Sequence, residues 1–358
     1  ADGLATLDST TKVPLTQLSN PALWRIVFSN LLGRKWWQCY NSEVNMVKYA
    51  NGLYVLACSE GIKYSTDGIT WQASNVTTYA LYVEHANGLW VAGGNIRFGI
   101  KYSTDGITWH DSNVASDFYT NSICYANGLW VVSSGASGGI KYSTNGITWQ
   151  DTNLPITVSG YGKVKYANGK WVTSSGYYST DGITWLKSNV IGGSRTQDSI
   201  HYAEGKWVRV GGDIYYSLDG ITWLQTNVYD SSLNYGVTSV HYANGLYIAT
   251  TEKDGASTTA VYFSFDGITW QNSTEPNTKD ADLSVAINYV NGVWFAGGQR
   301  SFKYSLDGIN WYLTDLPLGR EDFVHSISYI NGILFTATSS GLYFSSVDKL
   351  IEEGSIQI

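Results

Sequence analysis

A nine-residue segment, Lys63–Trp71, recurs along this chain and limits what the chain can fold into. Its sequence, KYSTDGITW, returns at Lys101–Trp109 and, with Asn145 in place of the aspartate, at Lys141–Trp149; looser copies end at Trp185, Trp223, Trp270 and Trp311. In every copy, Asp-Gly or Asn-Gly separates two short runs rich in Tyr, Ile, Thr and Trp. This pattern predicts a β-hairpin with a tight primed turn. Self-similarity at a period of about 40 residues indicates a repeat architecture.

A second motif, Tyr49–Tyr54 (YANGLY), alternates with the first. Related segments lie at His85–Trp90, Tyr125–Trp130, Tyr166–Trp171, Tyr202–Trp207, Tyr242–Tyr247, Tyr289–Trp294 and Tyr329–Leu334. Asn-Gly between apolar residues is again a hairpin signal, and Glu204-Gly205 is the one variant. One repeat therefore predicts four strands. In the sixth repeat these are Ser239–Ala243, Leu246–Thr251, Val261–Ser264 and Ile268–Asn272.

Four antiparallel strands in each repeat predict an all-β fold, the β-propeller, in which each repeat forms one blade. Eight copies of the second motif predict eight blades, with seven blades as the main alternative. The last repeat ends near Gly341–Ser345 without an Asp-Gly or a Trp, whereas Lys35–Gln38 matches Ile-Thr-Trp-Gln. We expect this N-terminal segment to supply the missing fourth strand, pairing Trp37 near Tyr343–Ser345. Such pairing closes the ring and removes exposed strand edges. The predicted propeller covers residues 35–347, between a segment at 1–34 and a tail at 348–358.

Composition excludes several classes of partner. The net charge of −7 and the pI near 5.2 argue against nucleic acid or an anionic membrane. No apolar run of about 18 residues is present, so no membrane span is expected. The three cysteines, Cys39, Cys58 and Cys124, lack metal-type spacing and are expected to be small buried side chains. We therefore expect neither a metal nor a cofactor. Because the chain begins at Ala1, we also expect a fragment or a processed product.

The Ser-x-Asp-Gly-x-Thr-Trp motif resembles the Asp-box of sialidase-type propellers, although it is one residue shorter. In that family the motif lies on the turn between the third and fourth strands, away from active sites, in both enzymes and binding proteins. A short polar side chain there can accept hydrogen bonds from its own turn, and the Trp offers a large apolar surface between blades. The resemblance thus implies a structural role for Asp67, Asp105, Asn145, Asp181, Asp219, Asp266 and Asp307.

The segment DGLATLDSTTKVPLTQL near the N-terminus resembles connector segments of bacteriophage tail fibres and tail spikes, which precede a distal receptor-binding domain. The resemblance implies a virion protein, acting outside the bacterial cell and bound to other tail-fibre proteins. It also raises a homotrimer as one possible assembly, although the chain has no coiled-coil heptads.

In an up-and-down blade, the two hairpin turns share one face of the ring, and the variable connections share the other. Loops on a rigid scaffold commonly carry binding residues. We expect the variable face to bind a bacterial surface glycan or an envelope protein, because rings stack on sugar faces and polar groups bind hydroxyls. The candidate residues are Tyr79, Arg97, Phe118, Tyr119, Tyr161, Arg195, Tyr229, Tyr235, Arg300 and Arg320.

Two alternatives stay open: a glycan hydrolase and a structural or protein-interaction propeller of a virion. A sialidase would require an arginine cluster, and arginine is scarce here. A glycosidase needs two suitably spaced carboxylates, for which Asp117, Asp198, Glu321 and Asp322 are the first candidates. We expect a binding protein rather than an enzyme.

The first strand of each repeat carries a mostly polar series at one equivalent position. Its members are Lys48, Glu84, Cys124, Lys165, His201, His241, Asn288 and Ser328. Strand alternation places the series on one side of the innermost strands. We interpret it as the lining of a water-filled channel with locally balanced charge. Two histidines in adjacent repeats, without a carboxylate, are a poor metal site.

Overall fold

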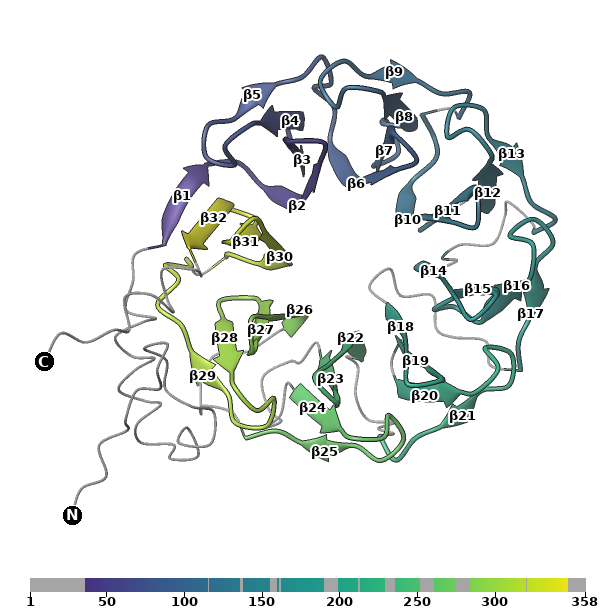
Figure 1. Ribbon diagram of the computed structural model, residues 1–358, viewed down its shortest axis with the longest axis vertical. Helices are drawn as coiled ribbons and strands as arrows, with labels where there is room; N and C mark the ends of the chain where they lie inside the picture. Colours follow the sequence, from purple (N-terminus) through teal and green to yellow (C-terminus); the bar gives the residue numbers. More distant parts are fainter. Residues whose placement is uncertain are drawn as a thin grey trace, which may run out of the picture.

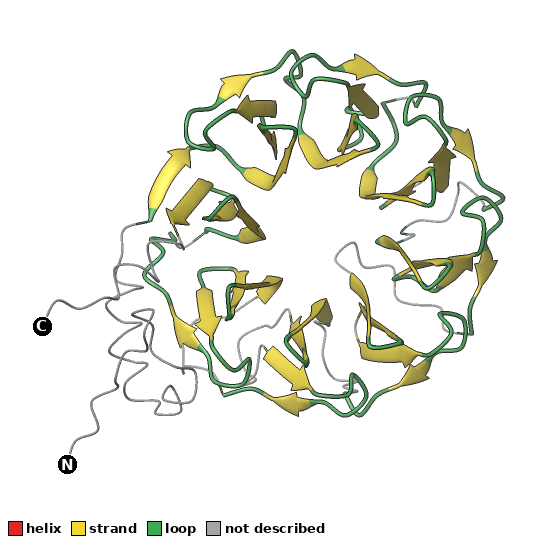
Figure 2. Cartoon of the chain, viewed as in Figure 1, coloured by secondary structure: helices red, strands yellow, loops and turns green. Residues whose placement is uncertain are grey.

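The protein forms a ring of eight four-stranded antiparallel sheets around a central axis (Figure 1). The computed structural model describes residues 36–114, 116–135, 138–154, 160, 162–189, 199–211, 213–228, 236–251, 261–274, 284–319 and 321–346. All regular structure in these residues is β-strand (Figure 2). The predicted eight-bladed propeller is confirmed, and the seven-bladed alternative is wrong.

Blades 1 to 7 run outward from their innermost strand in chain order, and the outermost strand of blade 8 is the N-terminal β1. Blade 1 contains β2 (Val44–Ala50), β3 (Leu53–Cys58), β4 (Gly61–Ser65) and β5 (Gln72–Ala73), and blade 2 contains β6 (Ala80–Ala86), β7 (Leu89–Gly94), β8 (Ile100–Ser103) and β9 (His110–Asp111). Blade 3 contains β10 (Thr120–Ala126), β11 (Leu129–Ser134), β12 (Ile140–Ser143) and β13 (Gln150–Asp151). Blade 4 contains β14 (Val164–Ala167), β15 (Lys170–Thr173), β16 (Tyr177–Ser179) and β17 (Leu186–Lys187). Blade 5 contains β18 (Ser199–Ala203), β19 (Lys206–Gly211), β20 (Asp213–Ser217) and β21 (Leu224–Gln225), and blade 6 contains β22 (Val237–Ala243), β23 (Leu246–Thr251), β24 (Val261–Ser264) and β25 (Gln271–Asn272). Blade 7 contains β26 (Ser284–Val290), β27 (Val293–Gly298), β28 (Phe302–Ser305) and β29 (Tyr312–Leu313). Blade 8 contains β30 (Val324–Ile330), β31 (Ile333–Thr338), β32 (Gly341–Ser346) and β1 (Trp37–Tyr40).

Blade 8 is completed by the N-terminal strand β1, as predicted. Trp37 lies opposite Phe344, and Gln38 lies opposite Tyr343. The sequence match was one residue out of register, however. Trp36, not Trp37, takes the place of the repeat tryptophan: it packs edge-on against Phe302 of blade 7, whereas Trp37 is 47% exposed. A register shift between Gln38 and Tyr40 absorbs the extra residue.

The two kinds of hairpin turn differ. In the Asn-Gly turns both central residues have positive φ, for example 52° at Asn51 and 79° at Gly52, as a type I′ turn requires. In the Asp-Gly turns only the glycine has positive φ, for example 76° at Gly68. The primed turn predicted there is therefore wrong. Side-chain hydrogen bonds hold a wider turn, and in blade 6 the fourth strand begins at Gln271 rather than Ile268.

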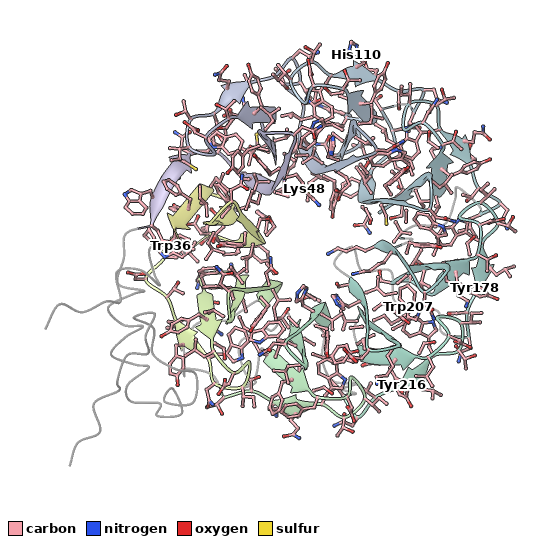
Figure 3. The ribbon with its side chains drawn as sticks, in the orientation of Figure 1. Trp36, Lys48, His110, Tyr178, Trp207 and Tyr216 are labelled. Carbon is pink, nitrogen blue, oxygen red and sulfur yellow. The ribbon has the colours of Figure 1, made fainter. Side chains whose placement is uncertain are left out.

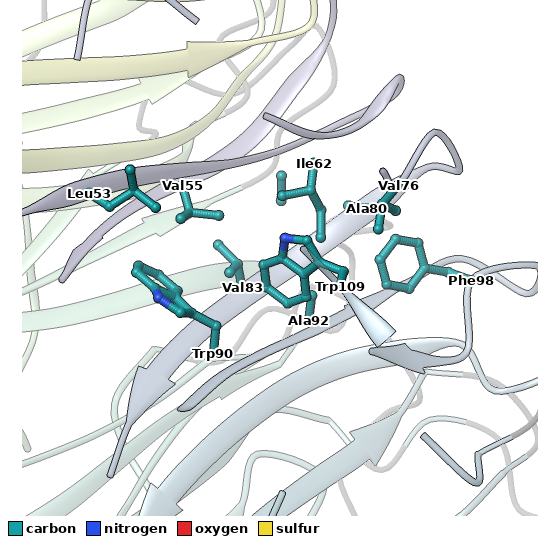
Figure 4. Packing of buried hydrophobic residues seen from close by; sticks show 11 residues of the cluster. Leu53, Val55, Ile62, Val76, Ala80, Val83, Trp90, Ala92, Phe98 and Trp109 are labelled. Atoms are coloured by element: carbon teal, nitrogen blue, oxygen red, sulfur yellow. The ribbon is translucent and has the colours of Figure 1, made fainter. Parts of the chain in front are cut away.

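The hydrophobic core lies between blades. In the cluster of Figure 4, Leu53, Val55 and Ile62 of blade 1 face Trp90 and Trp109 of blade 2, all five side chains being at most 8% exposed. The repeat tryptophans of blades 2 to 7 are all buried. Burial of such large rings on both sides of each sheet supplies much of the apolar area that stabilises the ring.

The strands of the propeller run from Trp37 to Ser346. The segments predicted as connector and tail lie outside the described residues. No helix long and apolar enough to cross a membrane occurs within the ranges given above. The three cysteines are free thiols, of which Cys58 is buried and Cys39 and Cys124 are half-buried.

Candidate functional site

The ring has two chemically different faces. Because each blade alternates strand direction, the Asn-Gly turns and the Ser-x-Asp-Gly turns emerge on one face, here called the turn face. The connections between second and third strands, and those from one blade to the next, emerge on the opposite loop face. The predicted separation of uniform turns from variable connections is therefore present.

Aspartates on the turn face are engaged in their own turns. The Ser65 hydroxyl donates to Asp67 Oδ1 (2.8 Å), and the same oxygen accepts from the amides of Ile69 and Thr70 (2.8 and 2.7 Å). The hydrogen bond from Thr70 is the largest of several that lower the pKa of Asp67. Equivalent hydrogen bonds occur at Asp105, Asn145, Asp181, Asp219, Asp266 and Asp307. Asn145 makes these bonds without a charge, so the turn requires an acceptor oxygen rather than an anion.

An asparagine after the fourth strand links neighbouring blades, and the sequence analysis missed it. Asn75 Nδ2 donates to the carbonyl of Trp109 (2.8 Å), while Asn75 Oδ1 accepts from the Trp109 amide (2.8 Å). The same double link occurs at Asn113, Asn153, Asn189 and Asn227. The signal was present in the Ser/Thr-Asn pair that follows five of the seven repeat tryptophans, those from Trp71 to Trp223. These residues hold neighbouring blades together.

Five of the ten candidate binding residues lie in the described part of the chain, on the loop face. Arg97 is exposed, and Tyr79, Tyr119 and Arg300 are half-buried. Phe118 is a correction: its side chain is 2% exposed and packs between blades 2 and 3, so its ring is not available to a ligand. The candidates outside the described residues are Tyr161, Arg195, Tyr229, Tyr235 and Arg320.

Glu43 joins three adjacent blades on the loop face. Glu43 precedes β2 of blade 1, and Tyr79 precedes β6 of blade 2. Glu43 Oε1 accepts a hydrogen bond from the Tyr79 hydroxyl (2.6 Å). His325 Nε2 of β30, in blade 8, lies 3.7 Å from the same oxygen. Burial and the Glu43 carboxylate raise the pKa of Tyr79, so its hydroxyl stays protonated and donates. Burial lowers the pKa of His325, and Glu43 opposes this effect. We call Glu43, Tyr79 and His325 the Glu43 cluster.

The sequence did not point to Glu43 or His325. Their segments lie 282 residues apart in the chain (325 − 43) and meet only because the ring closes. Tyr119 precedes β10 of blade 3 and Arg97 follows β7 of blade 2, which extends the polar and aromatic surface beside the cluster. The phenol, carboxylate, imidazole and guanidinium groups of these residues donate and accept hydrogen bonds.

A second carboxylate, Glu60, ties the closing strand to blade 1. The Tyr40 hydroxyl donates to Glu60 Oε2 (2.6 Å), the Ser42 hydroxyl donates to Oε1 (2.6 Å), and Lys63 Nζ lies 3.3 Å from Oε2. These contacts, led by Ser42, lower the pKa of Glu60 to about 2. Glu60 is thus committed to ring closure.

The predicted catalytic carboxylates are distributed over separate connections. Asp117 is exposed between blades 2 and 3, and Asp198 lies outside the described residues. Asp322 Oδ2 accepts the Gly319 amide (2.6 Å) within its own loop, and Glu321 Oε1 lies 3.9 Å from Arg300 Nη2. Asp117 and the Glu321–Asp322 pair therefore belong to different blade junctions. In the described ranges no group of three or more His, Cys, Asp or Glu residues is placed to hold a metal.

Comparison with known proteins identifies the fold. No protein-family model matches the sequence, and no curated protein matches it. Among solved structures, the chain is similar to the computationally designed Ika8 protein (TM-score 0.61, 14% identity, 86% of this chain and 96% of that one). It is also similar to the C-terminal WD40 domain of Sif2 (TM-score 0.59, 10% identity, 87% and 97%) and to YCF48 bound to a D1 peptide (TM-score 0.50, 16% identity, 73% and 90%). At these identities the similarity shows the propeller fold alone.

Proposed function

We propose that this propeller is the receptor-binding domain of a phage tail fibre and that its loop face recognises a bacterial surface glycan or envelope protein. The observation that carries the proposal is the contrast between the two faces. Uniform turns, whose polar groups bond to each other, occupy one face. Irregular connections with the Glu43 cluster, Tyr119 and Arg97 occupy the other.

The chemistry of the loop face favours a hydroxyl-rich ligand. Tyr119 is half-buried, so its ring is held in place and still reaches solvent. Aromatic surfaces of this kind stack on the apolar faces of sugars, while carboxylate, imidazole and guanidinium groups bind hydroxyls. The N-terminal resemblance to tail-fibre connectors supplies the phage context, with action outside the bacterial cell, attachment to other tail-fibre proteins and a homotrimer as the assembly to test.

Binding to a panel of bacteria that differ in surface polysaccharide tests the proposal. Labelled propeller is added to each strain, and released sugar is measured in the same tubes. We expect saturable, strain-selective binding without released sugar. Sugar release that depends on one Asp or Glu would instead identify a glycan hydrolase. Binding only to virion proteins would identify a structural propeller.

Matched variants test which face binds. Arg97→Glu reverses a charge on the loop face, and Lys206→Glu reverses one beside the Glu204-Gly205 turn on the turn face. We expect Arg97→Glu or Tyr119→Ala to weaken binding and Lys206→Glu to leave it unchanged. The assignment of the loop face is wrong if Lys206→Glu alone abolishes binding.

A further inference from the structure

The innermost strands carry an uneven distribution of charge around the ring axis. Figure 3 shows Lys48 at the inner edge of the ring and His110 at the outer edge. Equivalent positions on β2, β6, β14, β18 and β22 carry Lys48, Glu84, Lys165, His201 and His241. The one carboxylate of this series is therefore in blade 2, and three basic side chains follow one another in blades 4, 5 and 6.

In blades 1 and 2 the charges are paired. Lys48 Nζ lies 2.8 Å from Glu84 Oε2 and donates to Oε1 (3.1 Å). In blade 7, Asn288 Nδ2 donates to the Ile327 carbonyl of blade 8 (3.1 Å). The polar groups at these positions are bound by the protein itself.

Blades 4 to 6 present donors without a carboxylate. The rings of His201 and His241 meet edge-on with centroids 5.0 Å apart. Lys165 occupies the equivalent position on β14, which contacts β18, and its charge acts on both imidazoles. The ionisable group that acts on Lys165 is the thiol of Cys124. Within the described ranges, no Asp or Glu forms an ion pair with Lys165 or with either imidazole.

Burial disfavours positive charge on Lys165, His201 and His241, and a bound anion would stabilise that charge. Burial, followed by the charge of Lys165, lowers the pKa of His201 to about 3 and that of His241 to about 4. Burial also lowers the pKa of Lys165. A half-buried cation without a counter-ion is unfavourable, and a bound oxyanion would supply that counter-ion and accept hydrogen bonds from the ammonium and imidazole N–H groups.

We propose that Lys165, His201 and His241 form an oxyanion-binding site on the inner side of blades 4 to 6, which takes the carboxylate or phosphate group of a ligand. The ammonium of Lys165 supplies the charge, and the imidazoles supply directed N–H donors. The site is distinct from the Glu43 cluster, which belongs to blades 8, 1 and 2. It does not depend on the function proposed for the loop face.

Histidine ring signals in an NMR titration with inorganic phosphate test this site. The chain has only five histidines, so the signals of His201 and His241 can be assigned by single substitution. We expect these two signals to shift saturably, while those of His85 and His110 stay in place. A parallel titration with acetate shows whether the site also accepts a carboxylate.

The charge variants compare equivalent positions. Lys165→Met removes the ammonium group that is proposed to bind the anion. Because a charge-assisted hydrogen bond is lost, phosphate binding should weaken by roughly tenfold or more. Lys165→Arg retains the charge and should bind. Lys48→Met removes a lysine that already pairs with Glu84, and it should bind as the unmodified protein does.

Absence of a saturable shift in the unmodified protein would overturn the proposal. Equal phosphate affinity in Lys165→Met and the unmodified protein would do so as well. Lys165→Arg guards against misfolding in the methionine variant, because a folded arginine variant that fails to bind also contradicts the assignment.

Discussion

The asparagine link between blades gives a prediction that compares two junctions of one ring. At the junction of blades 2 and 3, Asn113 Nδ2 donates to the Trp149 carbonyl (2.9 Å), and its Oδ1 accepts from the Trp149 amide (2.7 Å). At the junction of blades 6 and 7, Thr274 occupies the equivalent position. There the backbone does the work, because the Trp311 amide donates to the Thr274 carbonyl (2.9 Å).

Replacing Asn113 by Ala removes two hydrogen bonds, whereas replacing Thr274 by Ala removes none of those at its junction. A neutral hydrogen bond contributes about 1 kcal/mol net. Asn113 is solvent-exposed, so water can replace part of each bond. We therefore expect Asn113→Ala to lower the free energy of unfolding by about 1 kcal/mol, which is less than two fully effective hydrogen bonds would contribute. We expect Thr274→Ala to change it by less than about 0.5 kcal/mol.

Urea unfolding followed by tryptophan fluorescence measures both variants. Amide hydrogen exchange adds a local measurement: Asn113→Ala should speed exchange at Trp149 and leave Trp311 unchanged. Equal unfolding midpoints for the two variants, with unchanged exchange at Trp149, would refute the claim that the asparagine side chain stabilises the junction.

Three further predictions concern other parts of the ring. Gly106→Ala should lower the free energy of urea unfolding by about 2 kcal/mol more than Gly88→Ala does. Both glycines have positive φ (75° and 73°), but a Cβ at Gly106 would lie 2.8 Å from Leu53 Cδ2, whereas one at Gly88 would meet no atom within 4 Å. The pKa of Glu60 is lowered to about 2, so its contribution to stability is present above its unfolded pKa of about 4.3 and is lost as the pH falls towards 2. Glu60→Gln should therefore make the free energy of unfolding less dependent on pH over that range. The change should be less than about 1 kcal/mol, because the side chain is 55% exposed. The pKa of His201 is lowered to about 3, so the unfolded chain binds a proton first, and stability falls as the pH drops from about 6.5 to about 3. His201→Gln should make the free energy of unfolding depend less steeply on pH over that range. An unchanged pH dependence would contradict the burial of a neutral His201.

The blade count was predictable because a turn leaves a local signal. Asn-Gly encodes a two-residue primed turn without help from distant residues, and eight such signals, one of them Glu204-Gly205, gave eight blades. The predicted closure was likewise a matter of counting fourth strands. The type of Asp-Gly turn was missed because it depends on where one carboxylate oxygen bonds. Asp67 Oδ1 draws in the amides of Ile69 and Thr70, and this delays the fourth strand to Gln72.

Single-residue register was less predictable where a bulge intervenes. Lys35–Gln38 contains two tryptophans, and only packing against Phe302 decides that Trp36 takes the buried place between blades. Phe118 was misjudged for a related reason. A connecting loop is expected to face solvent, but the segment between β9 and β10 turns this ring inward against Trp149 and Ile140. Alternation along a strand has no counterpart in a loop, so sequence alone does not say which loop side chains face inward.

The Glu43 cluster shows why a site on a closed ring is difficult to read from its repeats. Repeats report what all blades share, and the shared residues stabilise turns and junctions. A binding site on a propeller depends instead on what neighbouring blades do not share, here a carboxylate, a phenol and an imidazole from blades 1, 2 and 8. Glu43 and His325 become neighbours only after β1 pairs with β32. Closure therefore both stabilises the fold and assembles the cluster. A variant that weakens the pairing of β1 should separate His325 from Glu43 before the distant junctions of blades 3 to 6 open, and amide hydrogen exchange at β30 and β2 measures that order.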